Sequence, residues 1–409
     1  MKSASQLSTF RGTIDEALLR AHVMLPKYQQ GAMGDRGPQS PGAPAARPPQ
    51  PRPRILTHLN PTNFQYGVLD ALGDACVGYC MQLRQHGAVV VEQNYNFAQQ
   101  AVGAGPNTPW TFDTPMHVGS LSKMITAMSI TRVLNAVGVS PNNPINPYLP
   151  AYWTQGANIS EITFANLLTH TSGLTSGATD YESMKAAIAA GVTSAAYGQY
   201  AYANMNFSLC RILLSVLNGN VSVDYDPSFL FMTGGILEDV FWDYYTTADF
   251  QQYVAANVFS PSSSSGHMVH QPGDALAYDF PTSSTEVGYN DGDLTYLTGA
   301  GGWHMSANQF LNVMGTFRRG GSILSTQQAQ TMLDNGFGID WTYPTSAGGS
   351  YYSKNGSWTI NGQTEQAVAF YLPEDMELVV LVNSPVGDVP SVPLFLYSVI
   401  SDVYLANLG

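Results

Sequence analysis

The sequence places a serine hydroxyl and a lysine amine three residues apart, at Ser120 and Lys123. In a helix, positions i and i+3 lie on one face, so the two side chains can meet. A neutral or hydrogen-bonded lysine can take the serine proton and activate the oxygen as a nucleophile. We expect a helix over residues 120–136 with Ser120 at its start, where the helix dipole favours developing negative charge. Taken alone, the same spacing is also typical of an ordinary surface helix.

Tyr202 and Asn204 stand two residues apart, directly before an apolar run that predicts a helix over residues 206–217. On a loop, both side chains can point into one cleft. The phenol offers an acid/base hydroxyl, and the amide offers a donor and an acceptor for a substrate amide. A plain surface loop is the alternative interpretation of this pair.

A third group, Lys354 to Ser357, precedes a strand predicted over residues 358–360. Gly356 permits a backbone to pass close to a ligand, and Lys354 can orient an anionic or polar substrate group. The backbone N–H groups of Ser120 and Ser357 are candidate donors to an oxyanion. An ordinary turn at Asn355 and Gly356 is the alternative.

The elements that must position these groups fall into a simple order along the chain. Apolar periodicity and turn residues predict helices over 64–76, 162–168, 247–257 and 392–408, and strands over 78–84, 88–95, 366–372 and 377–382. Strands at both ends and helices in the middle predict an α+β fold, with one antiparallel sheet built from both chain ends, flanking helices and an inserted helical subdomain. We expect the sheet subdomain to comprise residues 55–118 and 295–409, and the helical subdomain residues 119–294.

Residues 1–54 differ from the rest, because they hold eight of the sixteen lysines and arginines and are rich in proline. Apart from a short helix predicted over residues 13–25, they have linker composition. They are either an inert tail or an arm that docks on another protein or another copy of this chain. The start of the sequence lacks the apolar segment of a secretory signal, and the polar composition of the body suits secreted or periplasmic enzymes as well, so the compartment stays open.

Composition narrows the choice of partners. Charged residues make up 11% of the chain and its formal net charge is −13, which disfavours nucleic acid. No apolar run is long enough for a membrane span. The three cysteines, Cys76, Cys80 and Cys210, are expected to be buried free thiols. The eight histidines show no His-x-x-x-His or paired Cys/His spacing, so the sequence favours neither a metal nor another cofactor.

Taken in order along the chain, the three groups resemble the serine β-lactamase and penicillin-binding-protein superfamily. The stretches HVGSLSKMITA at 117–127, LLTHTSGL at 167–174 and GAGGWHMSANQF at 299–310 strengthen this resemblance. It spans about residues 62–405 and is greatest to the branch that holds class C β-lactamases, D-aminopeptidases, D,D-carboxypeptidases and family VIII esterases.

The resemblance implies a role for each residue. Ser120 is the acylated nucleophile, Lys123 its proton partner, and Tyr202 the general base that later protonates the leaving group. Asn204 binds a substrate amide or steers Lys123, Lys354 tunes Tyr202, and Asn355 and Gly356 line the substrate site. His170 and His304 are interpreted as scaffold residues, with His304 near the mouth of the cleft.

Two departures from the superfamily pattern bear on the substrate. Asn355 stands where β-lactam-recognising members usually carry a hydroxyl, whereas Lys354 is retained where many esterase-like members have histidine. Residues 221–290 match no pattern and are expected to shape substrate choice. We therefore expect an esterase or peptidase acting through a serine acyl-enzyme on small or D-configured substrates. A β-lactamase or D,D-carboxypeptidase, an acyltransferase, and a non-catalytic scaffold or filament protein are the alternatives.

Overall fold

The computed structural model describes residues 58–101, 106–225, 236–281, 287–344, 350–387 and 395–408. The helix expected at 13–25 and the arm at 1–54 lie outside these residues. Within the described ranges, no helix is both long enough and apolar enough to cross a membrane. Cys76, Cys80 and Cys210 are buried free thiols, as predicted.

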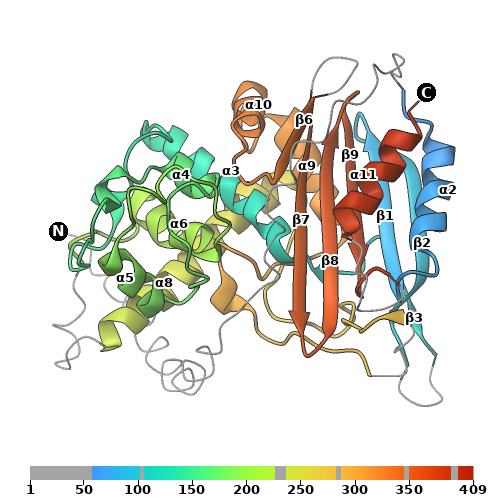
Figure 1. Cartoon of the computed structure of the whole chain (residues 1–409), viewed down its shortest axis with the longest axis horizontal. Coiled ribbons are helices and arrows are strands. Elements are labelled where there is room, and N and C mark those ends of the chain that lie inside the picture. Colours follow the sequence, from blue (N-terminus) through green and yellow to red (C-terminus); the bar gives the residue numbers. More distant parts are fainter. Residues whose placement is uncertain are drawn as a thin grey trace.

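The two ends of the chain share one seven-stranded antiparallel sheet (Figure 1). Its order is β3-β2-β1-β9-β8-β7-β6. The strands are β1 (Gly78–Gln85), β2 (Ala88–Gln99), β3 (Thr108–Pro109), β6 (Trp341–Pro344), β7 (Ser350–Ile360), β8 (Gln363–Leu372) and β9 (Met376–Val382). Because β1 pairs with β9, a single ladder joins the N-terminal and C-terminal parts. The predicted α+β class, with a sheet built from both chain ends, is confirmed.

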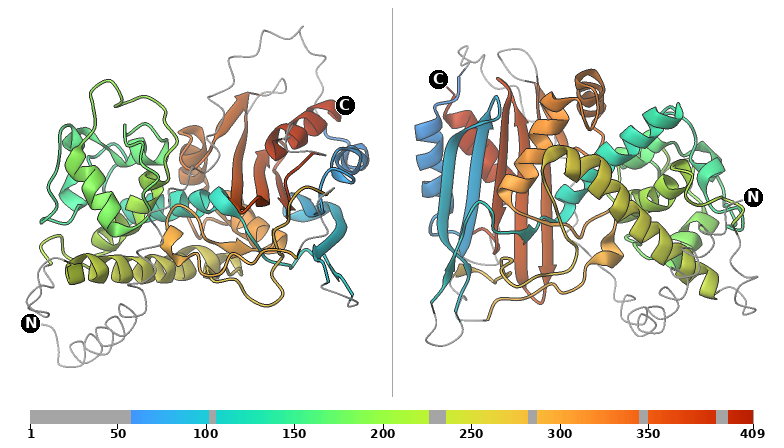
Figure 2. Two further views of the ribbon diagram at one scale, coloured as in Figure 1. Left: turned by 60° about the horizontal axis from the view of Figure 1, so that its bottom comes forward. Right: turned by 180° about the vertical axis from the view of Figure 1, so that it is seen from behind.

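Both faces of the sheet are covered. Side chains alternate across a strand, so Leu378 and Val380 of β9 face one apolar cluster while Val379 and Leu381 face the other. Helices α2 (Pro61–Leu72) and α11 (Leu396–Ala406) cover the first face, and α9 (Ala307–Gly315) lies on the second (Figure 2). This double burial explains the unbroken apolar run of β9.

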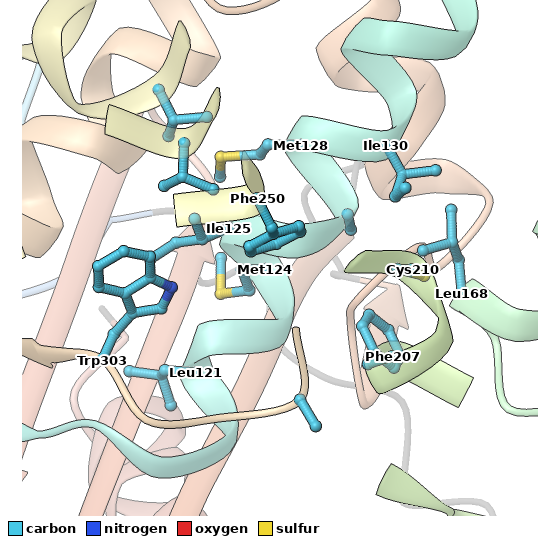
Figure 3. Packing of buried hydrophobic residues seen from close by; sticks show 14 of the residues in the cluster. Leu121, Met124, Ile125, Met128, Ile130, Leu168, Phe207, Cys210, Phe250 and Trp303 are labelled. Atoms are coloured by element: carbon cyan, nitrogen blue, oxygen red, sulfur yellow. The ribbon is translucent and has the colours of Figure 1, made fainter. Parts of the chain in front are cut away.

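The remaining helices gather mainly to one side of the sheet (Figure 1). They are α3 (Ser122–Val137), α4 (Phe164–Leu168), α5 (Tyr181–Ala190), α6 (Asn204–Leu217) and α8 (Ile236–Val254), with α10 (Thr326–Asp334) near β6. Helix α3 is buried over most of its length, and its Met124, Ile125 and Met128 pack near Trp303 and Phe250 (Figure 3). It therefore joins the helical part to the sheet.

Several predicted boundaries are wrong. Ser120 does not open an α-helix but lies in a 3₁₀ turn, Gly119–Leu121, before α3. Residues 354–357 neither form a turn nor open a strand, because pairing with β8 extends β7 through them. The helix expected at 247–257 begins at Ile236, where Glu238 and Asp239 favour a helix N-terminus.

Residues 267–281 and 287–289, assigned from the sequence to the helical part, lie against one end of the sheet. His267 bridges His304, and Tyr278 bridges Thr364 of β8. The Tyr278 N–H also donates to the Asn383 carbonyl at 2.8 Å. These described residues therefore cover the end of the sheet next to the turn that carries Ser120.

The packing of α3 predicts unequal effects along this one helix. Ile130→Ala removes a fully buried side chain, so we expect the free energy of unfolding to fall by about 2–5 kcal/mol. Val137→Ala, at a position that is 46% exposed near the end of α3, should change it by less than about 0.5 kcal/mol. Urea unfolding followed by circular dichroism measures both, and equal losses would contradict this packing.

Candidate active site

The turn that carries Ser120 is held by backbone pairing on its N-terminal side. The short strand β4 (Met116–His117) pairs with β5 (His304–Met305), and the Val118 N–H donates to the Trp303 carbonyl at 2.9 Å. Gly119 then takes φ +54°, a conformation that favours glycine. This sharp turn presents Ser120 at the start of α3, beside β7.

The side chains of the first two sequence groups meet at Ser120. Its Oγ lies 2.6 Å from the Tyr202 Oη, and the Lys123 Nζ donates to it at 2.9 Å. Tyr202 comes from the loop before α6, and Asn204 is the first residue of that helix. The structure thus brings together groups that are 82 residues apart in the chain.

Lys123 is fully buried and surrounded by oxygen atoms. Besides Ser120, its Nζ donates to the Asn204 Oδ1 at 2.9 Å and to the Ala300 carbonyl at 2.7 Å. An ammonium carries three N–H donors, and three acceptors are present here. Burying a charge without such partners is costly. The acceptor set therefore fits a protonated Lys123. The contact with Asn204 is the one expected for steering this lysine, one of the two roles that the resemblance implied.

Lys354 pairs with an acid that the sequence reasoning missed. Its Nζ lies 2.7 Å from the Asp340 Oδ1, and both side chains are almost fully buried. The other oxygen of Asp340 accepts the Asn355 backbone N–H at 3.0 Å. Asp340 therefore fixes both Lys354 and the backbone of β7. The Lys354 Nζ also lies 5.5 Å from the centre of the Tyr202 ring, and the Lys123 Nζ lies 5.1 Å from it.

Two glycines allow the serine turn and β7 to cross in close contact. A Cβ atom at Gly356 would lie 2.2 Å from the Val118 carbonyl oxygen and 2.9 Å from the Ser120 nitrogen. A Cβ at Gly119 would lie 2.9 Å from the Ser357 nitrogen. The two backbone nitrogens considered as oxyanion donors are thus held on neighbouring segments with no side chain between them.

His170 supports the loop that carries Tyr202. Its Nδ1 accepts the Ala203 N–H at 3.3 Å, and its ring centre lies 4.4 Å from that of Tyr202. Burial, followed by the positive charges of Lys123 and Lys354, holds the pKa of His170 well below its usual value. The ring is therefore neutral and acts as a hydrogen-bond acceptor. His304 is fully buried, and it lies on β5, which pairs with the strand that leads into the serine turn.

The fold and this arrangement of serine, lysine and tyrosine define the serine β-lactamase and penicillin-binding-protein superfamily. A family model described as Beta-lactamase matches residues 68–396, and the chain belongs to this family. A curated relative, "Putative penicillin-binding protein PbpX" of Bacillus subtilis (strain 168), is 24% identical over 228 residues, which are 54% of this chain. The match spans about half the length of that relative, 50%.

Solved structures share the fold at low sequence identity. The D-amino acid amidase from Ochrobactrum anthropi SV3 superposes with a TM-score of 0.63 at 15% identity, over 85% of this chain and 98% of its own. The octameric penicillin-binding protein homologue from Pyrococcus abyssi superposes with a TM-score of 0.61 at 16% identity. The superposition covers 85% of this chain and 76% of the homologue. These likenesses establish the architecture, while the substrate has to be argued from this chain.

The close crossing of the two segments predicts that alanine substitutions at two glycines, Gly356 and Gly301, change the rate of acylation very differently. Gly356→Ala should displace the serine turn, because the new Cβ meets backbone atoms that cannot rotate away. We expect the rate of acylation by a serine-directed probe to fall by about 10²-fold or more, as for loss of an oxyanion donor. In Gly301→Ala the added atom has nothing closer than 3.6 Å, so that variant should keep its rate. Equal rates in both variants would contradict the crossing.

The neutral state of His170 predicts an acid-dependent loss of stability. An unfolded histidine titrates near about 6.5, whereas burial lowers the pKa of folded His170. The unfolded chain therefore binds one more proton below that pH. This proton lowers the unfolding free energy by up to about 1.4 kcal/mol per pH unit as pH falls.

His170→Asn should reduce the measured slope by this share, because asparagine retains an acceptor and tolerates the φ of +57° found here. The part due to buried His117, whose pKa burial lowers to about 3, should remain. Urea unfolding at a series of pH values between neutral and mildly acidic measures it. An unchanged slope in the variant would mean that His170 does take up a proton in the folded chain.

Proposed function

We propose that this chain is a serine hydrolase that works through an acyl-enzyme on ester or amide bonds of small or D-configured substrates. The observation that carries the proposal is the placement of the Ser120 Oγ, 2.6 Å from the Tyr202 phenol and 2.9 Å from the Lys123 ammonium. A nucleophile within hydrogen-bond reach of a base, with a third group that orients the base, is the general signature of covalent catalysis.

Tyr202 is the base in this proposal. The acceptors around Lys123 fit a protonated amine, which cannot accept the serine proton. Two ammonium groups flank the Tyr202 ring at 5.1 and 5.5 Å, and nearby positive charge favours a phenolate. The Ser120 proton therefore moves to the Tyr202 oxygen as the serine oxygen attacks the substrate carbonyl carbon.

The remaining steps use the same atoms. The backbone N–H groups of Ser120 and Ser357 donate to the oxyanion of the tetrahedral intermediate. The bond to the leaving amine or alcohol breaks as Tyr202 returns the proton to it, which leaves an acyl-serine. Water then attacks the ester, gives its proton to Tyr202, and the acid departs as Ser120 regains a proton.

Two features bear on the substrate. The Asn355 backbone N–H donates to the Asp340 carboxylate. The Asn355 side chain stands in place of the hydroxyl expected for binding a β-lactam carboxylate. The amidase neighbour is described as acting on D-amino acids. Both favour a D-amino acid amide or a small ester over a β-lactam.

The proposal predicts a covalent adduct on a single residue. Intact-mass analysis with a fluorophosphonate should show one adduct per wild-type chain and none on Ser120→Ala. Ser129→Ala is the matched control, because that hydroxyl lies on α3 and donates to the Ile125 carbonyl. An adduct that persists on Ser120→Ala would end the assignment.

Turnover measurements on the same wild-type and variant proteins distinguish the substrate classes. We expect turnover of p-nitrophenyl esters or D-amino acid amides to exceed that of nitrocefin. Faster nitrocefin turnover would favour a β-lactamase. An adduct without turnover, released only by an added amine or alcohol, would favour an acyltransferase, and no adduct at all would favour a scaffold protein.

A further inference from the structure

Histidines and acids gather close to the serine turn but outside the proposed catalytic group. His267 and His304 face each other across a backbone bridge, with their rings stacked at 5.2 Å. The His270 ring meets the His304 ring edge-on at 5.8 Å. Asp274 and Asp291 complete this group, called the histidine cluster below. Its members come from the segment 267–274, from the loop at 291 and from β5.

Several polar atoms of the histidine cluster make no hydrogen bond although they are buried. They include both ring nitrogens of His304, the Nδ1 of His270 and both carboxylate oxygens of Asp291. The side chains of His304 and Asp291 are 0% and 1% exposed. Buried polar groups are nearly always hydrogen-bonded. Asp291 has the rings of His117 and His304 within 3.5 Å, whereas the Nδ1 atoms of His270 and His304 have no hydrogen-bond partner among the described residues. These two ring nitrogens call for a partner.

We propose that the histidine cluster is a binding site for a divalent transition metal, with His270, His304 and Asp274 as ligands. The candidate ligand atoms of these three residues all lie within 4.8 Å of one another. Two imidazoles and a carboxylate suit Zn²⁺ and its neighbours Co²⁺ and Ni²⁺ rather than Mg²⁺ or Ca²⁺. Three protein ligands leave one tetrahedral position for water.

Asp291 orients His304 in this site. Its Oδ2 lies 3.4 Å from the His304 Nε2, so that nitrogen can carry the proton and point it at the carboxylate. The other ring nitrogen, Nδ1, then keeps its lone pair for the metal. A carboxylate behind a metal-bound histidine is a common arrangement, which fixes the tautomer and strengthens the ligand. It also gives the buried charge of Asp291 a compensating cation nearby.

Asp274 is prepared for the metal in a similar way. Its Oδ2 accepts a bond from the His267 Nε2 at 2.7 Å and one from the Gln271 N–H at 2.8 Å. These bonds fix the carboxylate and leave its Oδ1 for a cation. The side chain of His267 is 21% exposed, and His270 is half-buried, so an ion can enter from this side.

A second arrangement, His117 with Asp291 and Glu365, fits a metal less well. The His117 Nε2 accepts the Gly302 N–H at 3.2 Å, so a neutral His117 must carry its proton on Nδ1. That nitrogen faces Asp291 and Glu365 at 3.5 and 3.4 Å. A neutral His117 therefore turns an N–H, and not a lone pair, toward these carboxylates, although the Nδ1 forms no hydrogen bond with them.

The test measures metal binding directly and needs no enzymatic activity. The full chain without a histidine tag is stripped with EDTA and titrated with Zn²⁺ by calorimetry and with Co²⁺ by visible absorption. We expect one ion per chain, with the intense bands of four-coordinate Co²⁺. Ser120→Ala should bind equally well, so failure of the proposed hydrolase would not affect this result.

Variants identify the site. His270→Gln and Asp274→Asn should abolish the one-to-one binding, and Asp291→Asn should weaken it by about 10–100-fold. His86→Gln is the control, because that ring is 71% exposed and lies outside the cluster. If His304→Gln does not fold, metal binding by His270→Gln still tests the site, because His270 is only half-buried. Absence of saturable binding to the wild type, or wild-type affinity in His270→Gln, would overturn the proposal.

Discussion

The buried ammonium of Lys123 is the interaction on which the rest of the site depends. A charge with no solvent contact is tolerated only when each of its donors has a partner. Here the three acceptors come from the same turn, from the start of α6 and from the loop at Ala300. The helical part and the segment leading into β5 must therefore converge on α3. The Ser120 hydroxyl is positioned by the same contacts that stabilise the lysine ammonium.

The close contact between the serine turn and β7 is the second constraint, and it explains why the sheet must contain both chain ends. The turn follows β4, near the N-terminal side, whereas β7 belongs to the C-terminal part. Pairing of β1 with β9 brings these parts into one sheet. Only glycine at 119 and 356 leaves room for the two backbones. Loss of either glycine would separate the candidate oxyanion donors even if every reactive side chain stayed in place.

The sequence predicted the sheet from apolar strands at both chain ends, and it predicted Ser120, Lys123, Tyr202 and Lys354 from the order of three groups that are each ambiguous alone. Ser120 and Lys123 share a helical spacing, and the apolar periods of β1 and β9 are long. Asp340 was missed because nothing in the chain before β7 distinguishes it from other acids. The Ala300 carbonyl was missed because every residue has a backbone carbonyl, so the residue type does not show which one accepts from Lys123. The histidine cluster was missed because its members are distant in sequence, although the three-residue spacing of His267 and His270 was a signal.

The loop from Gly299 to Gly302 links the two sites physically. Its Ala300 carbonyl accepts from Lys123, and its Gly302 N–H donates to His117. His117 in turn faces Asp291, the residue that holds His304. One short loop is thus fixed on one side by the Lys123 ammonium beside Ser120 and on the other by the buried ring of His117. Electrostatic catalysis needs groups that do not rearrange as charge develops. A loop held from both sides meets that need of the proposed hydrolase, and His117 with its neighbour Asp291 connects the loop to the histidine cluster.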